Sequence, residues 1–256
     1  MLALPVVLIL LLGAALGSFA NVLVVRIKEG SSIGGRSRCP SCRKTIRAKH
    51  LIPVVSWLWL KGRCAMCRKP IHWQYPAVET AMAVLAVVAF LRHLDDPSQA
   101  ALWAVAFELA VSFCFLVITA FDLRWQLVPL EFTAASAMLV GAGRTLMGDD
   151  WLRVALGAVT VAVVLGFFVL ASRGALMGEG DPVVGLLVGA ALGFPLALAG
   201  IVVSFVIGGS VAAALLVQGS VTRKTPVPFA PFLAAGTLVA LWYAEPIGSY
   251  LQFAFM

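Results

Sequence analysis

The fold of this chain is limited most by a series of apolar runs, several of them long enough to cross a membrane. A helix needs about 20 apolar residues to span a hydrocarbon core of roughly 30 Å. The chain has 256 residues, of which 61% are hydrophobic and only 12% are charged. Soluble globular domains are far more polar than this, so the sequence predicts an integral membrane protein.

The apolar runs predict an all-α membrane protein with about eight transmembrane helices. Strand-like alternation is nowhere convincing, and backbone groups in lipid must find their hydrogen bonds within the chain, which favours a helical bundle. The short run at 183–194 can span only if it begins at the membrane edge. The predicted spans cover residues 2–25, 77–94, 101–120, 127–147, 152–172, 183–194, 196–217 and 228–244.

Basic residues indicate the orientation of these helices. The segment 26–75 holds twelve of the nineteen Lys and Arg residues and a single acid, Glu29. By the positive-inside rule this segment is cytoplasmic. The first run has no basic segment before it, so we interpret it as an uncleaved anchor with its N-terminus outside. The net charge of +7 is thus explained by orientation, and no nucleic-acid partner is expected.

Four of the five cysteines lie in this loop, as two Cys-x-x-Cys pairs. Such pairs are typical of a tetrahedral zinc site, and a metal would stabilise a loop that has little apolar surface of its own. Disulfides or redox chemistry are the alternative, which the reducing cytosol disfavours. His50 and His72 are expected to be ordinary loop residues, and Cys114 a small core residue. The predicted zinc ligands are Cys39, Cys42, Cys64 and Cys67.

The stretch 52–60 contains Trp57 and Trp59. Tryptophan prefers the boundary between membrane and water, so the stretch is interpreted as an amphipathic turn at that interface. Packing of the same residues under the cysteine pairs is the alternative.

Two aspartates stand at the ends of apolar runs that the predicted topology brings to the cytoplasmic face. Asp122 follows the run 101–120, and Asp181 comes just before the run 183–194. Carboxylates at such places are costly unless something uses them. Two neighbouring carboxylates share a proton, so one can act as general base on water and the other as general acid on a peptide bond. The pair predicts a protease that needs neither a metal nor a serine.

Both aspartates also have structural explanations. Asp181 followed by Pro182 is a common helix start, in which the carboxylate caps the helix. Asp122 is close in sequence to Arg124 and could pair with it. In the run Gly178-Glu179-Gly180-Asp181, the two glycines are expected to leave room for an extended substrate backbone beside the acid.

Several motifs occur in the order seen in one known family. The chain resembles the type IV prepilin peptidases, which are membrane aspartyl proteases of the Gly-x-Gly-Asp kind. The resemblance runs from about residue 13 to residue 240. It rests on the two cysteine pairs and on Gly17-Ser18-Phe19-Ala20-Asn21-Val22, Pro53-Val54-Val55-Ser56-Trp57-Leu58, Tyr75-Pro76-Ala77-Val78-Glu79, Phe121-Asp122-Leu123, Val128-Pro129, Gly178-Glu179-Gly180-Asp181 and Pro228-Phe229-Ala230-Pro231-Phe232-Leu233-Ala234.

The resemblance implies a function for each part of the chain. Such enzymes remove a short basic leader from prepilins and from pseudopilins of type II secretion, at the cytoplasmic face of the bacterial inner membrane. Many then methylate the new N-terminal amine with S-adenosylmethionine, and the cysteine loop occurs in these two-function members. The resemblance makes Asp122 and Asp181 the catalytic pair. It places Gly178, Gly180 and Glu79 near the active site or the methylation site.

These inferences divide the chain into three parts. We expect a transmembrane anchor at 1–25, a cytoplasmic zinc loop linked to methyl transfer at 26–75, and a transmembrane aspartyl peptidase domain at 76–256. The expected partners are prepilins, pseudopilins and the lipid bilayer. On physical grounds alone, Glu79 is equally well explained as an acid at the interface.

The chain departs from the family pattern at several places. Val183 stands where the family carries a lysine, the segment 49–51 lacks an Asp-Asn pair, and Ala230 replaces a glycine. These departures leave open a second interpretation, a catalytically weak scaffold that binds pilins or secretion components. A transporter whose acids line an ion path is a third, although the inverted repeats typical of transporters are not apparent.

Overall fold

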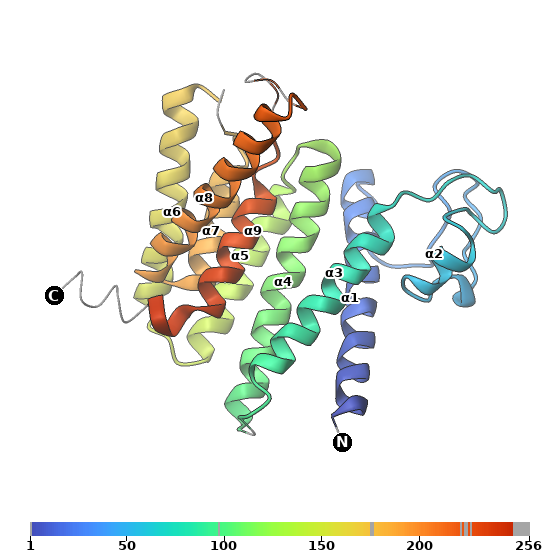
Figure 1. The fold of residues 1–256 in the computed structure, drawn as a ribbon, viewed down its shortest axis with the longest axis horizontal. Coiled ribbons are helices and arrows are strands. Elements are labelled where there is room, and N and C mark those ends of the chain that lie inside the picture. The colour runs from blue at the N-terminus through green and yellow to red at the C-terminus, as the bar shows by residue number, and fades with distance from the viewer. Residues whose placement is uncertain are drawn as a thin grey trace. The chain divides into compact units, whose positions relative to one another are not determined.

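The computed structural model of the chain describes residues 2–247, apart from 97, 175, 176, 221, 223, 224 and 226. These residues form helices, and the β pairing among them is limited to two isolated bridges within the segment 38–70. By its internal contacts the chain divides into two compact units, Met1–Ala120 and Phe121–Met256 (Figure 1). The all-α fold predicted from the apolar runs is confirmed.

The first unit is built on the packing of α1 (Ala3–Glu29) against α3 (Gln74–Arg92). A small residue allows the close approach, because a Cβ atom at Gly17 would lie only 2.6 Å from Glu79 Cα. Small residues commonly let membrane helices pack in this way. The helix α4 (Gln99–Trp125) contributes its length up to Ala120 to this unit. The apolar core contains Met82, Ala86 and Leu109, with Leu16, Val105, Phe113 and Leu116 packed against them.

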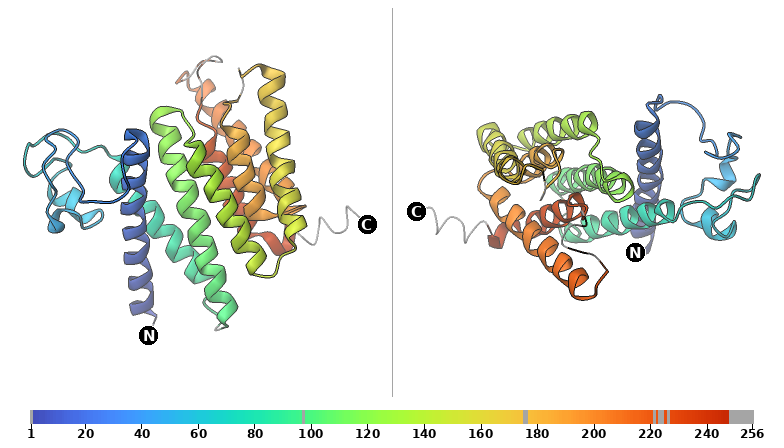
Figure 2. Two further views of the ribbon diagram at one scale, coloured as in Figure 1. Left: turned by 180° about the vertical axis from the view of Figure 1, so that it is seen from behind. Right: turned by 90° about the horizontal axis from the view of Figure 1, so that it is seen from above.

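Residues 30–73 form the loop between α1 and α3. Its regular parts are a 3-10 turn (Ala48–His50) and the short helix α2 (Val55–Trp59). Figures 1 and 2 show this loop standing to the side of α1, not beyond its end.

The two tryptophans of α2 have different surroundings. Trp57 fills the space beside Gly62, where a Cβ atom would lie 2.9 Å from its ring, and its Nε1 donates to the Ile71 carbonyl at 3.3 Å. Trp59 is 67% exposed. Packing beside the second cysteine pair therefore explains Trp57, whereas Trp59 has the exposure expected of an interface residue.

The second unit has α7 (Asp181–Leu192) at its centre. This helix packs against α5, α6, α8 and α9, and most of its side chains are buried (Figures 1 and 2). A helix that is apolar on all sides is expected in such a position. The surrounding helices are α5 (Leu130–Leu146), α6 (Trp151–Ser172), α8 (Leu196–Val217) and α9 (Ala230–Trp242).

Each predicted span coincides with a helix. Of the described helices, α1, α3, α4, α6 and α8 are long and apolar enough to cross a membrane, and α7 and α9 are shorter apolar helices. The helices α1 and α4 continue beyond their apolar runs, because hydrogen bonding extends a helix through polar residues until the backbone is turned away. In α1 this happens at Gly30, which has a φ of 60°.

Candidate functional site

The four loop cysteines come together in the first unit. Their sulfur atoms all lie within 4.8 Å of one another, and Cys39 Sγ is 3.9 Å from Cys67 Sγ. All four are free thiols. A tetrahedron with Zn–S bonds of about 2.3 Å has edges of roughly 3.8 Å, so the group could hold a metal ion such as zinc.

The two halves of this cluster repeat each other. The sequence Arg-Cys-x-x-Cys-Arg-Lys-x-Ile occurs at 38–46 and again at 63–71. In each copy the amide of the first cysteine donates to the carbonyl of the lysine, at 3.0 and 2.9 Å, and the arginine after the second cysteine has a φ of 59° or 58°. The repeat is visible in the sequence, and it signals two equivalent turns that direct their thiols to one centre.

Backbone amides favour ionisation in this cluster. The amides of Cys67 and Met66 lower the pKa of the Cys64 thiol to about 7. The thiolate is the form that ligates a metal, and four thiols this close cannot all ionise unless a cation lies between them. His72 is not part of this group within the described residues, and its Nδ1 accepts a hydrogen bond from the Gln74 amide at 3.1 Å. Within the described residues the metal-binding group consists of the four predicted cysteines.

Asp181 is the first residue of α7, and its side chain is buried, with 6% exposed. One carboxylate oxygen, Oδ2, accepts a hydrogen bond from the Gly178 amide at 2.9 Å. The N-cap position is occupied by Gly180, and no side chain caps this helix. The carboxylate therefore turns back onto the loop before α7, and the capping explanation for Asp181 is wrong.

Asp122 is also buried, with 6% exposed, and lies in the last turn of α4. Its Oδ2 accepts a hydrogen bond at 3.1 Å from the amide of Ala230, the first residue of α9. The first amides of a helix have no partner within it and favour a negative group. Arg124 places its guanidinium group 4.8 Å from the ring centre of Trp125. The start of α9 thus holds Asp122, although 108 residues separate the two in sequence.

Packing brings the segments that carry the two aspartates together within the second unit, because Gly180, next to Asp181, lies against Val128, six residues after Asp122. Among the described residues, neither carboxylate forms an ion pair. Buried carboxylates that lack a cationic partner are stable together only if a proton is shared between them. Such a pair can supply a general base and a general acid at one place.

The glycines before Asp181 have different surroundings. A Cβ atom at Gly180 would lie 2.6 Å from Val128 Cβ, whereas one at Gly178 would lie 3.5 Å from an Asp181 oxygen, an ordinary contact. The space beside Gly180 is filled by Val128. This glycine is therefore required by the packing of the segment that follows α4, and it leaves no gap there for a substrate.

Glu79 belongs to the first unit and lies in the second turn of α3. Its side chain is buried, and its Oε2 accepts a hydrogen bond from the Val54 amide at 2.7 Å. Nearby, Asn21 Nδ2 donates to the Tyr75 carbonyl at 3.0 Å, which fixes the first turn of α3 against α1. Glu79 therefore joins α3 to the turn between the two cysteine pairs.

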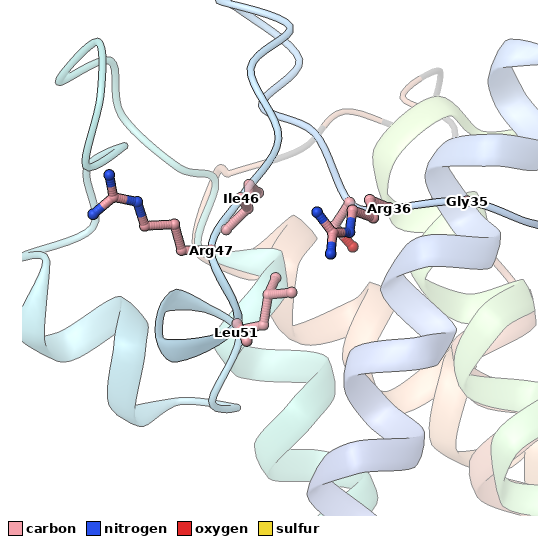
Figure 3. A pocket seen from close by; sticks show the side chains of 7 residues that line it. Gly35, Arg36, Ile46, Arg47 and Leu51 are labelled. Atoms are coloured by element: carbon pink, nitrogen blue, oxygen red, sulfur yellow. The ribbon is translucent and has the colours of Figure 1, made fainter.

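The loop also borders an open pocket of about 460 Å³, lined by residues 35–37, 46–48 and 51. Figure 3 shows Ile46 and Leu51 facing the space beside Arg36, while the guanidinium group of Arg47 points away from it. The lining contains no acidic side chain. No carboxylate of this lining could therefore pair with the amino group of a methyl donor.

Comparisons with known proteins agree with the motifs. The family model described as Bacterial Peptidase A24 N-terminal domain matches residues 11–93. A prepilin leader peptidase/N-methyltransferase of Bacillus subtilis (strain 168) is 30% identical over 93% of this chain and 94% of its own length. The chain belongs to the prepilin leader peptidase/N-methyltransferase family.

Other members of the prepilin leader peptidase/N-methyltransferase family match to a similar degree. The relative from Stutzerimonas stutzeri is 30% identical over 96% of this chain and 93% of its own length. The relative from Aeromonas hydrophila is 31% identical over 81% of this chain and 71% of its own length. No solved structure matches the chain.

Two departures from the prepilin peptidase pattern can now be placed. Ala230 replaces the family glycine, but it acts on Asp122 through its backbone amide and is fully buried, so the substitution preserves this contact. Val183 lies half-buried in the first turn of α7, where the family has a lysine. The contact of Ala230 was missed in the sequence, because nothing in a motif tells which distant side chain its amide meets.

Proposed function

We propose that this protein removes the leader peptide of prepilins and pseudopilins and then methylates the new N-terminus. The observation that carries the peptidase part is the pair Asp122 and Asp181. Both are buried in the second unit, each is held by a backbone amide, and Gly180 beside Asp181 packs against Val128 in the segment that follows Asp122. Membership of the family supports the same conclusion.

In the proposed reaction the two carboxylates share one proton. The ionised member takes a proton from a water molecule, which attacks the carbonyl carbon of the peptide bond. The protonated member donates to the carbonyl oxygen, and a proton then passes to the leaving amine. The amides of Gly178 and Ala230 hold the carboxylates in place through both steps.

We place this site at the cytoplasmic face of the bacterial inner membrane. The twelve basic residues of the segment 26–75 favour a cytoplasmic loop, and with it an external N-terminus. If each successive helix crosses the membrane in the opposite direction, Asp122 and Asp181 lie at that same cytoplasmic face. A prepilin whose apolar helix lies in the bilayer would present its leader at that face.

The cysteine cluster would hold a structural zinc ion. Four thiolates close the coordination sphere and leave no open position for catalysis, so the metal would stabilise the loop. Methyl transfer would use S-adenosylmethionine, a donor inferred from the family alone.

The peptidase assignment is tested by incubating the purified protein with a prepilin peptide and separating the products by mass. Asp122→Asn and Asp181→Asn preserve the shape of each side chain and its hydrogen bond from the backbone. Each is expected to slow cleavage at least about 1,000-fold. Glu131→Gln, an exposed acid in the first turn of α5, is the matched control and should cleave as the wild type does.

Cleavage at the wild-type rate by both Asp122→Asn and Asp181→Asn would contradict the dyad mechanism. A wild-type protein that binds prepilin but never cleaves it would favour the scaffold, the interpretation that Val183 suggests. A cleaved product without the added methyl group would support the peptidase assignment and contradict the methyltransferase assignment.

A further inference from the structure

The peptidase chemistry leaves one buried carboxylate unused, that of Glu79, which is only 7% exposed. Its hydrogen-bond partners are the Val54 amide, at 2.7 Å, and the Ser18 side chain, both of them neutral. Within the part of the chain that the structure describes, Glu79 forms no ion pair. The carboxylate is therefore buried without a counter-ion.

The other buried glutamate of the first unit provides the contrast. Glu108 is 6% exposed, and its Oε1 lies 3.0 Å from His93 Nε2 and 3.6 Å from Arg92 Nε. The unit thus neutralises Glu108 with its own cations but not Glu79, although the adjoining loop is rich in lysine and arginine. A buried carboxylate without a counter-ion is neutralised either by a bound proton or by a cationic ligand.

The Val54 amide, which donates a hydrogen bond to Glu79, lies in a strained turn. Val54 has φ 60° and ψ −52°, and the amide of Val55 donates to the Pro53 carbonyl at 2.6 Å, which closes a γ-turn of positive φ. A branched side chain rarely adopts this conformation, which costs about 1–3 kcal/mol. A cation that replaced the Val54 amide at Glu79 would let the turn relax, so this contact is one that a ligand can displace.

We propose that Glu79 binds the N-terminal ammonium group of the processed pilin and takes up its proton for methylation. The inference rests on the proposed methyltransferase function and names the group that holds its substrate. Glu79 lies roughly 8 Å along α3 from the loop end of that helix, a short reach for a peptide terminus. The turn that covers it belongs to the loop with the cysteine cluster, which links the metal site to methyl transfer.

One proton of the ammonium group passes to Glu79, leaving a neutral amine. The amine lone pair forms a bond to the methyl carbon of a sulfonium donor, and the bond from carbon to sulfur breaks with its electron pair going to sulfur. The products are the N-methylated ammonium, a neutral thioether and protonated Glu79, which releases its proton to solvent.

Glu79→Gln separates this role from a structural one, because the amide oxygen of glutamine can still accept the Val54 hydrogen bond. The variant is expected to cleave prepilin and to retain its zinc, while methylation at pH 7 falls roughly 100-fold. Its methylation rate should rise roughly tenfold between pH 7 and pH 9, as an amine with a pKa of about 8 loses its proton unaided. Glu108→Gln, the matched control, should methylate as the wild type does.

Binding gives a readout that does not depend on turnover. A processed pilin peptide with a free amine should bind Glu79→Gln at least about tenfold more weakly than it binds the wild type. The same peptide acetylated at its N-terminus carries no charge and should bind both proteins equally. If Glu79→Gln loses zinc and cleavage together, Glu79→Asp decides, since it keeps the carboxylate and should retain at least a tenth of the methylation.

Four results would overturn the proposal. The first is methylation by Glu79→Gln within threefold of the wild type at pH 7, and the second is a loss of methylation in that variant that does not change with pH. The third is that Glu79→Gln binds the methyl donor more weakly but the peptide as well as the wild type does. The fourth is that Glu79→Asp methylates no faster than Glu79→Gln. A wild-type protein that never methylates would instead contradict the proposed methyltransferase function itself.

Discussion

Replacing Gly157 with alanine should damage the peptidase although Gly157 does not touch either aspartate. Gly157 lies in α6 where this helix crosses the end of α7. A Cβ atom there would lie 2.7 Å from the Gly189 carbonyl oxygen and 2.8 Å from the carbonyl carbon of Gly193. All of these neighbours are backbone atoms, so no side-chain rotation can relieve the overlap.

The size of the effect follows from these contacts. Carbon and oxygen atoms that are not bonded normally stay at least about 3.3 Å apart, so α7 would have to move by roughly half an ångström or more. Overpacking of this kind costs about 3 kcal/mol at the upper end, and the better helix propensity of alanine returns about 1 kcal/mol. A net loss of about 2 kcal/mol is expected. Because α7 begins with Asp181, its displacement should also lower kcat/KM roughly 100-fold.

Gly166→Ala is the matched control, since Gly166 lies in the same helix and a Cβ atom there meets nothing within 4 Å. It should be neutral or slightly stabilising. The stability of both variants is measured by unfolding them with increasing amounts of a denaturing detergent while circular dichroism records the helix content. Cleavage of a prepilin peptide measures kcat/KM. Equal stability and equal activity of the two variants would refute the close crossing of α6 and α7.

Three further predictions concern the loop and the segment before α7. Cys64→Ser should release the metal and reduce methylation more than cleavage, and full zinc content in that variant would contradict the cluster. Gly180→Ala should slow cleavage roughly tenfold, and adding Val128→Gly, which removes the Cβ atom that the new methyl group would meet, should restore much of the loss, a coupling that a double-mutant cycle measures. Trp57→Ala should destabilise the loop by about 3 kcal/mol in thermal unfolding, whereas Trp59→Ala should change it by less than about 1 kcal/mol; equal effects would contradict their different burial.

The helices could be predicted from the sequence because an apolar run in lipid has few alternatives to a helix. Their ends were less predictable, since Asp122 lies inside α4 and Asp181 inside α7, although both follow or precede an apolar run. Helix ends depend on hydrogen bonding and backbone angles, and hydrophobicity does not report these.

The cysteine cluster was predictable as well, because ligand spacing within each pair is a local property. The contacts that hold the acids were not. Asp122 is bound by an amide 108 residues away, and Glu79 by one 25 residues earlier. Backbone amides have the same chemistry at every position, so no residue type marks the ones that will reach a carboxylate.

The central claim is that Asp122 and Asp181 act as one catalytic unit, and a double-mutant cycle on kcat tests it most directly. Residues that share one function do not add their losses. The account predicts that the double variant Asp122→Asn/Asp181→Asn cleaves a prepilin peptide no more slowly than either single variant, each already at least about 1,000-fold below the wild type. Losses that multiply, or a single variant that keeps more than about a tenth of the wild-type rate, would contradict it.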